Sequence, residues 1–215
     1  MEKNTKLSIG NIIKLASIEW RVLCVENNKA LLISEKILEK QPYNIDVTVP
    51  TTWENSALRK YLNGEFLKKL APIKSRIADT LNVNPDNPWY GTKGGNDTLD
   101  KVFALSLDEV VKYFGDSGAL AQKQGDDIKY YHYENGVQEI PKPEPDKWCW
   151  FGDQYNNARI ATLDGEGPSW WWLRTTGFRS VLTTGVTDDG CVAVRGGLDG
   201  GPTGGGSRPA LWLNL

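Results

Sequence analysis

The sequence Trp170-Trp171-Trp172-Leu173-Arg174 begins a C-terminal stretch that ends with Ser207-Arg208-Pro209-Ala210-Leu211-Trp212-Leu213-Asn214-Leu215. Large apolar residues dominate both ends, a composition that favours strands packed against a core. Successive side chains of a strand point to opposite faces, so Trp171 is expected to face away from Trp170 and Trp172. We interpret the two ends as scaffold and residues 177–207 between them (the insert) as the working surface.

The insert has an unusual residue alphabet, because it contains no Lys, Glu, Gln, Met or Trp. None of these five residue types is encoded by a codon that ends in a pyrimidine, whereas every residue type present can be. Random change at the first two positions of Asn codons would produce this alphabet. A Gly-rich loop that lacks long side chains by chance or for steric reasons is the alternative, and the excess of Gly fits that alternative.

The residues around and inside the insert predict a β-rich C-terminus. Strands are expected at 170–174, 185–194 and 209–213, with Asp188-Asp189-Gly190 as a turn. The run from Gly196 to Gly206 is rich in Gly but lacks the Lys and Ser/Thr of a Walker loop and the spacing of a dinucleotide loop. A flexible surface loop is therefore favoured over a nucleotide site.

The N-terminal part of the chain predicts strands and then helices. Ile12–Leu15 is a short strand, and Glu19–Val25 and Ala30–Ser34 form a hairpin that turns at Asn27-Asn28. Apolar residues at four-residue spacing then predict a helix, which Asn63-Gly64 is expected to break. The members of this apolar face are Leu58, Leu62, Phe66 and Leu70.

A second helix is predicted after a buried strand at Lys101–Leu105. It begins at Ser106, which with Glu109 has the spacing of a capping box. Loops are expected over 82–97 and 115–146. A hairpin, two helical zones and a β-rich C-terminus predict an α+β fold rather than an alternating βαβ fold.

Length and composition limit the classes of protein. At 215 residues the chain is expected to form a single domain, residues 1–215. A net charge of −2 gives no reason to expect a nucleic-acid partner. Cys24, Cys149 and Cys191 lie far apart, which argues against a disulfide framework and a zinc ribbon. Neither a signal peptide nor a membrane span is expected, so the cytoplasm is the default location; a cell-surface location would require a removed leader.

Motifs for catalysis or metal binding are weak. His132 is the one histidine and no nucleophile elbow accompanies it, so a catalytic triad and a multi-His metal site are disfavoured. The acidic pairs lack the spacing of a calcium loop and are interpreted as solvated turns. They are Asp126-Asp127, Asp188-Asp189 and Asp164 with Glu166. No catalytic residue, metal or cofactor is expected.

Four blocks of the sequence carry a resemblance to a known family. Trp171–Arg174 before the insert and Arg208–Trp212 after it resemble the C-terminal signature of a bacterial domain family, common in gut Firmicutes, that is related to the C-type lectin fold. Trp53–Asn63 and Asp100–Ser106 resemble its earlier blocks. Some members look like the variable proteins of diversity-generating retroelements, in which adenine-directed mutagenesis of a repeat rich in Asn codons diversifies a ligand-binding face.

The resemblance implies a C-type-lectin-like fold in which N- and C-terminal strands, Ile12–Leu15 and Leu211–Leu213, share an antiparallel sheet. Thr175 and Thr176 stand where the family usually has Ser and Pro. Gly177, Val186, Gly190 and Val192 would belong to the frame. The diversified ligand-binding residues, expected to face water, would be Phe178, Arg179, Val181, Leu182, Thr187, Asp188, Ala193, Arg195, Gly197 and Leu198.

Three functions remain open on this reading. The leading one is a non-catalytic binding module whose ligand is set by the insert, with a protein favoured over a glycan. The alternative is an enzyme similar to the formylglycine-generating oxidases, which need a reactive Cys pair; Cys191 and Cys149 are the candidates. A calcium-dependent sugar binder is a weaker option, because no Glu-Pro-Asn or Trp-Asn-Asp motif is present.

Overall fold

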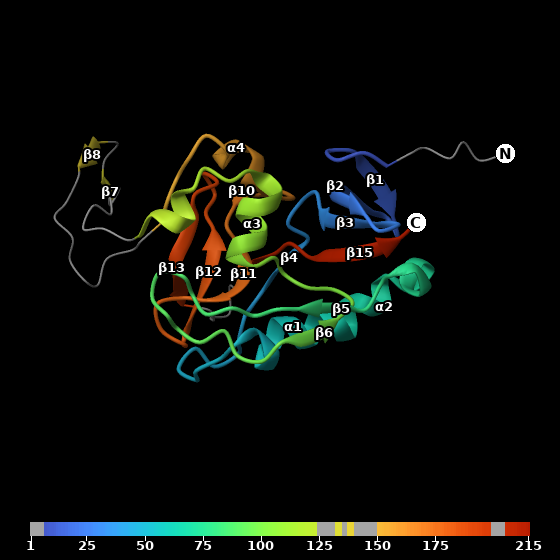
Figure 1. Cartoon of the computed structure of the whole chain (residues 1–215), viewed down its shortest axis with the longest axis horizontal. Helices are drawn as coiled ribbons and strands as arrows, with labels where there is room; N and C mark the ends of the chain where they lie inside the picture. Colours follow the sequence, from blue (N-terminus) through green and yellow to red (C-terminus); the bar gives the residue numbers. More distant parts are fainter. Residues whose placement is uncertain (1–6, 124–131, 135–136, 140–149, 199–204) are drawn as a thin grey trace.

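The computed structural model describes residues 7–123, 132–134, 137–139, 150–198 and 205–215. Helices and largely antiparallel sheets occur together without βαβ alternation, so the predicted α+β class is confirmed (Figure 1). In the described part of the chain, no helix has the length and apolar character needed to cross a membrane.

The first sheet joins the two ends of the chain in the strand order β1-β2-β3-β15. The predicted hairpin is confirmed, since Asn27 and Asn28 both have positive φ angles between β2 and β3. β15 pairs antiparallel with β3 and not with Ile12–Leu15, which lies at the opposite edge because β1 occupies the other side of β2. The strands are β1 (Ile12–Leu15), β2 (Ile18–Glu26), β3 (Lys29–Ser34) and β15 (Ala210–Asn214).

The second sheet holds the insert, in the order β13-β12-β11-β14-β4. β11, β12 and β13 are antiparallel neighbours, and the predicted turn at Asp188-Asp189-Gly190 connects β12 to β13, with Gly190 at φ +83°. β14 pairs parallel with β11 and antiparallel with β4. The strands are β4 (Glu39–Gln41), β11 (Trp171–Thr176), β12 (Leu182–Val186), β13 (Val192–Leu198) and β14 (Gly205–Ser207).

The end of the Gly-rich run is a buried strand, so the prediction of a surface loop over all of it is wrong. A Cβ atom on Gly205 would lie 2.3 Å from the Trp170 ring, and one on Gly206 would lie 2.5 Å from the Trp170 carbonyl oxygen. Only glycine lets the backbone approach so closely. Residues 199–204 of the run lie outside the described residues.

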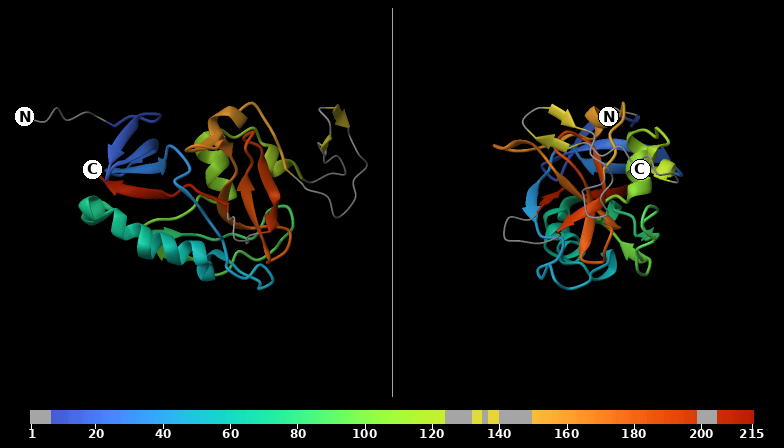
Figure 2. Two further views of the ribbon diagram at one scale, coloured as in Figure 1. Left: turned by 180° about the vertical axis from the view of Figure 1, so that it is seen from behind. Right: turned by 90° about the vertical axis from the view of Figure 1, so that its left-hand side faces the viewer.

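Residues 57–69 form one continuous helical run, composed of α1 (Ala57–Tyr61), a π turn (Leu62–Phe66) and α2 (Leu67–Lys69). The predicted break at Asn63-Gly64 is wrong, because Gly64 does not take a positive φ. Instead the Asn63 side chain accepts the Lys101 amide at 2.9 Å and donates to the Val102 carbonyl at 2.9 Å. The apolar face is buried as predicted. Figure 2 shows the run beneath the first sheet.

The capping box of α3 (Leu107–Phe114) is confirmed, because Ser106 accepts the Glu109 amide and Glu109 accepts the Ser106 amide. Lys101–Leu105 is largely buried, but it is not a strand beyond one bridge from Phe103 to Ala210. The smaller elements are β5 (Thr80–Asn82), β6 (Thr98–Asp100), β7 (His132–Glu134), β8 (Val137–Glu139), α4 (Asn156–Arg159), β9 (Ala161–Leu163), β10 (Gly167–Ser169) and 3₁₀ turns at Trp53–Asn55, Ala71–Arg76 and Ala119–Lys123.

Tryptophans at the start of β11 connect the sheet to the core. Trp171 faces the Phe114 ring at 6.3 Å, whereas Trp172 faces Tyr43 at 5.7 Å and Trp170 at 4.5 Å. The predicted alternation is therefore confirmed. Trp171 and Trp172 are almost fully buried, and Trp170 is 40% exposed, so the indole before β11 is free to border a surface cavity.

Candidate functional site

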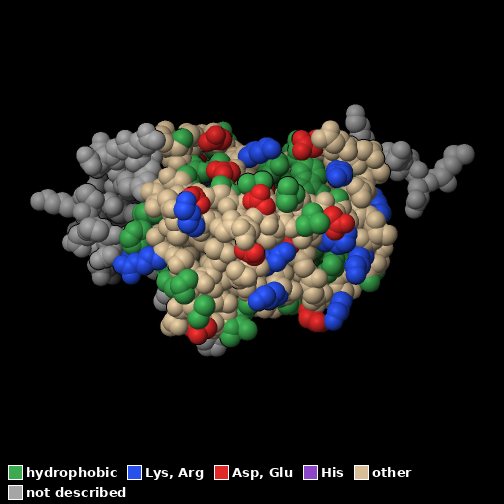
Figure 3. Space-filling model, turned by 60° about the horizontal axis from the view of Figure 1, so that its bottom comes forward, with side chains coloured by type: hydrophobic (Ala, Val, Ile, Leu, Met, Phe, Trp, Pro, Cys, Tyr) green, Lys and Arg blue, Asp and Glu red, His purple; other side chains and the backbone are tan. Residues whose placement is uncertain are grey.

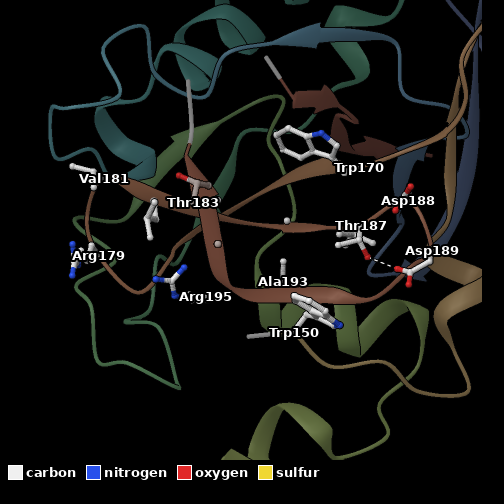
Figure 4. Close-up of a pocket in the computed structure, with 15 residues that line it drawn as sticks. Trp150, Trp170, Arg179, Val181, Thr183, Thr187, Asp188, Asp189, Ala193 and Arg195 are labelled. Atoms are coloured by element: carbon white, nitrogen blue, oxygen red, sulfur yellow. Dashed lines mark hydrogen bonds between the residues drawn. The ribbon is translucent and has the colours of Figure 1, made fainter. Parts of the chain in front are cut away.

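One face of the β12–β13 hairpin is hollowed into a cavity of about 830 Å³ (Figure 4). Small-molecule sites usually measure about 300–1,000 Å³, so the cavity is large enough for a ligand group. Val192 and Val194 point the other way and are fully buried in the core. Alternate positions of the hairpin line the cavity, and three residues between them contribute as well. The alternate positions are Thr183, Gly185, Thr187, Ala193, Arg195 and Gly197, and the others are Leu182, Val186 and Gly196.

Most of the predicted ligand-binding residues meet in this cavity. Phe178 does not line it, but its ring packs edge-on against Tyr90 at 4.9 Å. Leu198 pairs with Leu182 through the backbone, and its side chain lies outside the described part. The predicted residues that line the cavity are Arg179, Val181, Leu182, Thr187, Asp188, Ala193, Arg195 and Gly197.

The predicted positions do not all face water as expected. Arg179 and Asp188 are exposed, but Leu182 and Ala193 are each only 9% exposed. The reason is that the surface is concave, so side chains on its floor are covered by its rim. Leu182 and Ala193 nevertheless lie outside the hydrophobic core cluster.

The four positions assigned to the frame are fixed by their surroundings. A Cβ atom on Gly177 would lie 2.3 Å from the Arg195 carbonyl oxygen, and one on Gly190 would lie 2.0 Å from that of Asn156. Val186 and Val192 belong to the core cluster, although Val186 also contributes to the cavity lining. A side-chain change at these positions would therefore disturb the backbone or the core, unlike a change at a cavity position that lies outside the core cluster.

The hairpin backbone is held by residues outside the insert. The Asn87 side chain donates to the carbonyl oxygens of Thr176 at 2.7 Å and Val194 at 3.0 Å. The Thr92 hydroxyl donates to the Phe178 carbonyl at 2.9 Å. Sequence reasoning assigned Asn87 and Thr92 to a loop and missed this role, because a single Asn or Thr carries no signal for a partner distant in sequence.

The two ends of the cavity carry opposite charges (Figure 4). Arg179 and Arg195 lie at one end, with their guanidinium carbons 5.3 and 5.6 Å from the Phe178 ring centroid. Asp188 and Asp189 lie at the other end. Burial acts to raise the pKa of Asp189, but hydrogen bonds from the Thr187 hydroxyl and the Cys191 amide outweigh it and lower that pKa. A ligand thus meets a polarised surface.

Two buried polar groups at the cationic end have no hydrogen-bond partner among the described residues. They are the Thr183 hydroxyl and the Nε of Arg195. Thr183 is 1% exposed, so its hydroxyl is shielded from bulk water. Sequence reasoning missed Thr183 and Trp150 as site residues. Trp150 and Trp170 border the cavity on opposite sides (Figure 4).

Comparison with known proteins places the chain in a family. The model of a family described as Domain of unknown function (DUF6273) matches residues 27–215, which include β3, the whole second sheet and every residue of the cavity. The chain belongs to the DUF6273 family. Neither the curated proteins nor the solved structures give a significant match. Because the description of DUF6273 assigns no activity, function has to be argued from the cavity itself.

The cysteine candidate for an enzyme is poorly suited to attack. Burial, helped by the charge of Asp189, raises the pKa of the Cys191 thiol to about 11. The thiolate is the reactive form, so at neutral pH this thiol is a weak nucleophile. Cys149, its proposed partner, lies outside the described residues.

Asp164 and Glu166, two of the other acidic candidates, do not line the cavity. Asp164 and Glu166 form ion pairs with Lys36 and Lys40, at 2.7 and 2.6 Å. Among the residues described, no three His, Cys, Asp or Glu side chains are grouped as a metal site would require. Asp126-Asp127 and the His132 side chain lie outside the described part. On the face shown in Figure 3, basic and acidic side chains are interspersed.

Proposed function

We propose that this chain is a non-catalytic ligand-binding protein, with the cavity face of the β12–β13 hairpin as its binding surface. The observation that carries the proposal is that eight of the ten residues expected to vary line one cavity. Their backbone is held by Asn87 and Thr92, which lie outside the insert. Side chains on this face can therefore change without loss of the hairpin.

The proposal extends to the scaffold and to the origin of the insert. We infer a C-type-lectin-like scaffold, supported by the return of β15 to the N-terminal sheet. The restricted residue alphabet of the insert supports a variable protein of a diversity-generating retroelement. A protein ligand is favoured, because Arg179, Arg195 and Phe178 are of the residue types that anchor protein interfaces.

A glycan is the second candidate ligand, favoured by Trp170 at the rim. An indole that is 40% exposed can stack on a sugar ring. A glycan array read with and without a calcium chelator tests this candidate. Glycan binding that survives chelation would support a calcium-independent glycan site. Glycan binding that is lost on chelation would support a calcium-dependent sugar binder instead.

Substitutions on opposite faces of the β12–β13 hairpin test the binding surface. Thr187→Asn and Arg195→Asn change cavity positions and should alter the unfolding free energy by less than about 1 kcal/mol. Val192→Asn and Val194→Asn change residues of β13 that are fully buried in the core and do not line the cavity, so they bury an amide there and should cost about 3 kcal/mol or more. Urea denaturation of the four variants gives the comparison. Equal losses on the two faces would contradict a surface built to vary.

The nucleotide sequence around the gene tests the retroelement origin separately. We expect a near-repeat of the insert that differs only at adenines, together with a reverse transcriptase gene. If both are missing, the diversification mechanism is refuted, while a plain binding protein with the same cavity remains.

A further inference from the structure

Two positive charges share one end of the cavity. Arg179 and Arg195 both lie against the Phe178 ring, and within the described residues neither forms an ion pair. The carboxylates of Asp188 and Asp189 are at the far end (Figure 4). Two cations on one ring repel each other, so an anion placed between them would be attracted to both.

The unpartnered polar groups at this end call for a hydrogen-bond acceptor. The Thr183 hydroxyl and the Arg195 Nε can both donate, and neither has a partner among the described residues. The neighbouring Thr184 hydroxyl, by contrast, donates to the Thr175 carbonyl at 2.8 Å. Buried polar groups are nearly always hydrogen-bonded, so the unpartnered hydroxyl of Thr183 and the unpartnered Nε of Arg195, together with the charge of Arg179, point to a bound anion.

The middle of the cavity is lined by residues with small side chains or none. The floor there is formed by Gly185 and Ala193, which pair across β12 and β13. Trp170 borders it on one side and Trp150 on the other (Figure 4). A planar ring can lie on a floor of this kind and contact indoles at its edges or faces, which is the geometry that aromatic groups prefer.

We propose that the cavity takes a flat aromatic group that carries a carboxylate. The ring lies between Trp150 and Trp170, and the carboxylate accepts hydrogen bonds from Arg195 and the Thr183 hydroxyl beside the charge of Arg179. This rests on the proposed function and adds the chemical class of the ligand. The same chemistry occurs in a free aromatic acid and in a peptide that places an acidic side chain beside an aromatic one.

Calorimetric titration with two matched probes tests the carboxylate. N-acetyltryptophan and N-acetyltryptophanamide differ only in that group, and we expect the acid to bind at least about tenfold more tightly. Two blocked peptides with an internal Glu-Trp or Gln-Trp pair distinguish the source. Binding of the Glu-Trp peptide without binding of the free acid would assign the site to a protein segment, and the reverse would assign it to a free or C-terminal acid.

Substitutions identify the residues that bind the carboxylate. Arg195→Gln and Arg179→Gln should each weaken binding of the preferred acidic probe at least about tenfold and leave binding of its amide counterpart unchanged. Thr183→Val should weaken the acidic probe by about threefold to tenfold. Arg76→Gln is the matched control, because Arg76 is exposed, contacts the Asn214 carbonyl and does not line the cavity.

Equal binding of acidic and amide probes, or equal loss of both in Arg195→Gln, would overturn the proposal, as would no binding of any probe. These failures can be separated from failure of the proposed function. If the protein keeps its stability with Thr187→Asn but binds no probe, only the ligand class is rejected. If the unsubstituted protein binds the acidic probe but the Thr187→Asn variant does not fold, the ligand class is supported and the diversified surface is rejected.

Discussion

Arg174 shows why one side chain before the insert matters to the whole hairpin. It lies in β11, is 4% exposed, and its two terminal nitrogens contact the Glu109 carboxylate. The same guanidinium donates to the Ala104 carbonyl at 2.9 Å and to Asn84 Oδ1 at 3.2 Å. A planar fork with five donors can satisfy these partners together, whereas an ammonium group cannot. Arg174 therefore fastens β11 to α3 and to the segment before β6.

Arg174→Ala should lower the unfolding free energy by about 3–5 kcal/mol, because it leaves the Glu109 charge and several acceptors without a partner. Lys36→Ala is the control, since it breaks the ion pair with Asp164, whose side chain is 83% exposed. An exposed pair contributes less than about 1 kcal/mol. Urea denaturation measures both variants. Similar small losses would show that Arg174 is not a structural anchor.

At the scale of elements, a substitution at Gly64 tests whether residues 57–69 form one continuous helical run. It keeps a helical conformation in the π turn, and a Cβ atom there would meet nothing within 4 Å. Gly64→Ala should therefore raise the unfolding free energy by about 0.4–1 kcal/mol, since alanine loses less conformational freedom on folding. Thermal unfolding measures the change. A loss of stability would mean that Gly64 takes a left-handed conformation after all.

Sequence patterns correctly predicted the elements whose structure depends on residues close to one another in the sequence. The Asn27-Asn28 turn and the capping box of Ser106 with Glu109 depend on contacts within a few residues. The predictions were wrong where contacts between residues distant in sequence determine the structure. Asn63 holds the Lys101–Val102 backbone with its side chain, so the helix continues and Lys101–Leu105 does not extend a strand ladder.

For the candidate site, the sequence predicted which residues would meet but not the shape of their surface. Alternation along β13 brings Ala193, Arg195 and Gly197 to one face, while the start of β12 and the segments that flank it supply the other expected variable positions. The cavity is bordered by Trp150 and Trp170, which lie outside the insert, and its lining includes Thr183, whose hydroxyl is buried. No local sequence pattern predicts that these side chains border one cavity, because tertiary packing brings them together.

At the scale of the whole molecule, Arg208 joins the two sheets. It lies between β14 of the second sheet and β15 of the first, and is 3% exposed. Its guanidinium donates to the carbonyl oxygens of Ser34 at 3.1 Å and Arg159 at 3.2 Å, and its carbon lies 4.9 Å from the Trp171 ring. One side chain thus contacts the N-terminal sheet, the segment around α4 and the strand that precedes the insert.

Arg208→Lys should therefore destabilise both sheets together. An ammonium group cannot reach all the carbonyl acceptors, and each buried acceptor left unpaired costs about 1–3 kcal/mol. Far-ultraviolet and tryptophan-sensitive near-ultraviolet dichroism should show one shared transition at lower temperature. Arg76→Lys, at an exposed arginine, should change stability by less than about 0.5 kcal/mol. Two separate transitions, with only one shifted, would show that the sheets unfold independently and that Arg208 does not couple them.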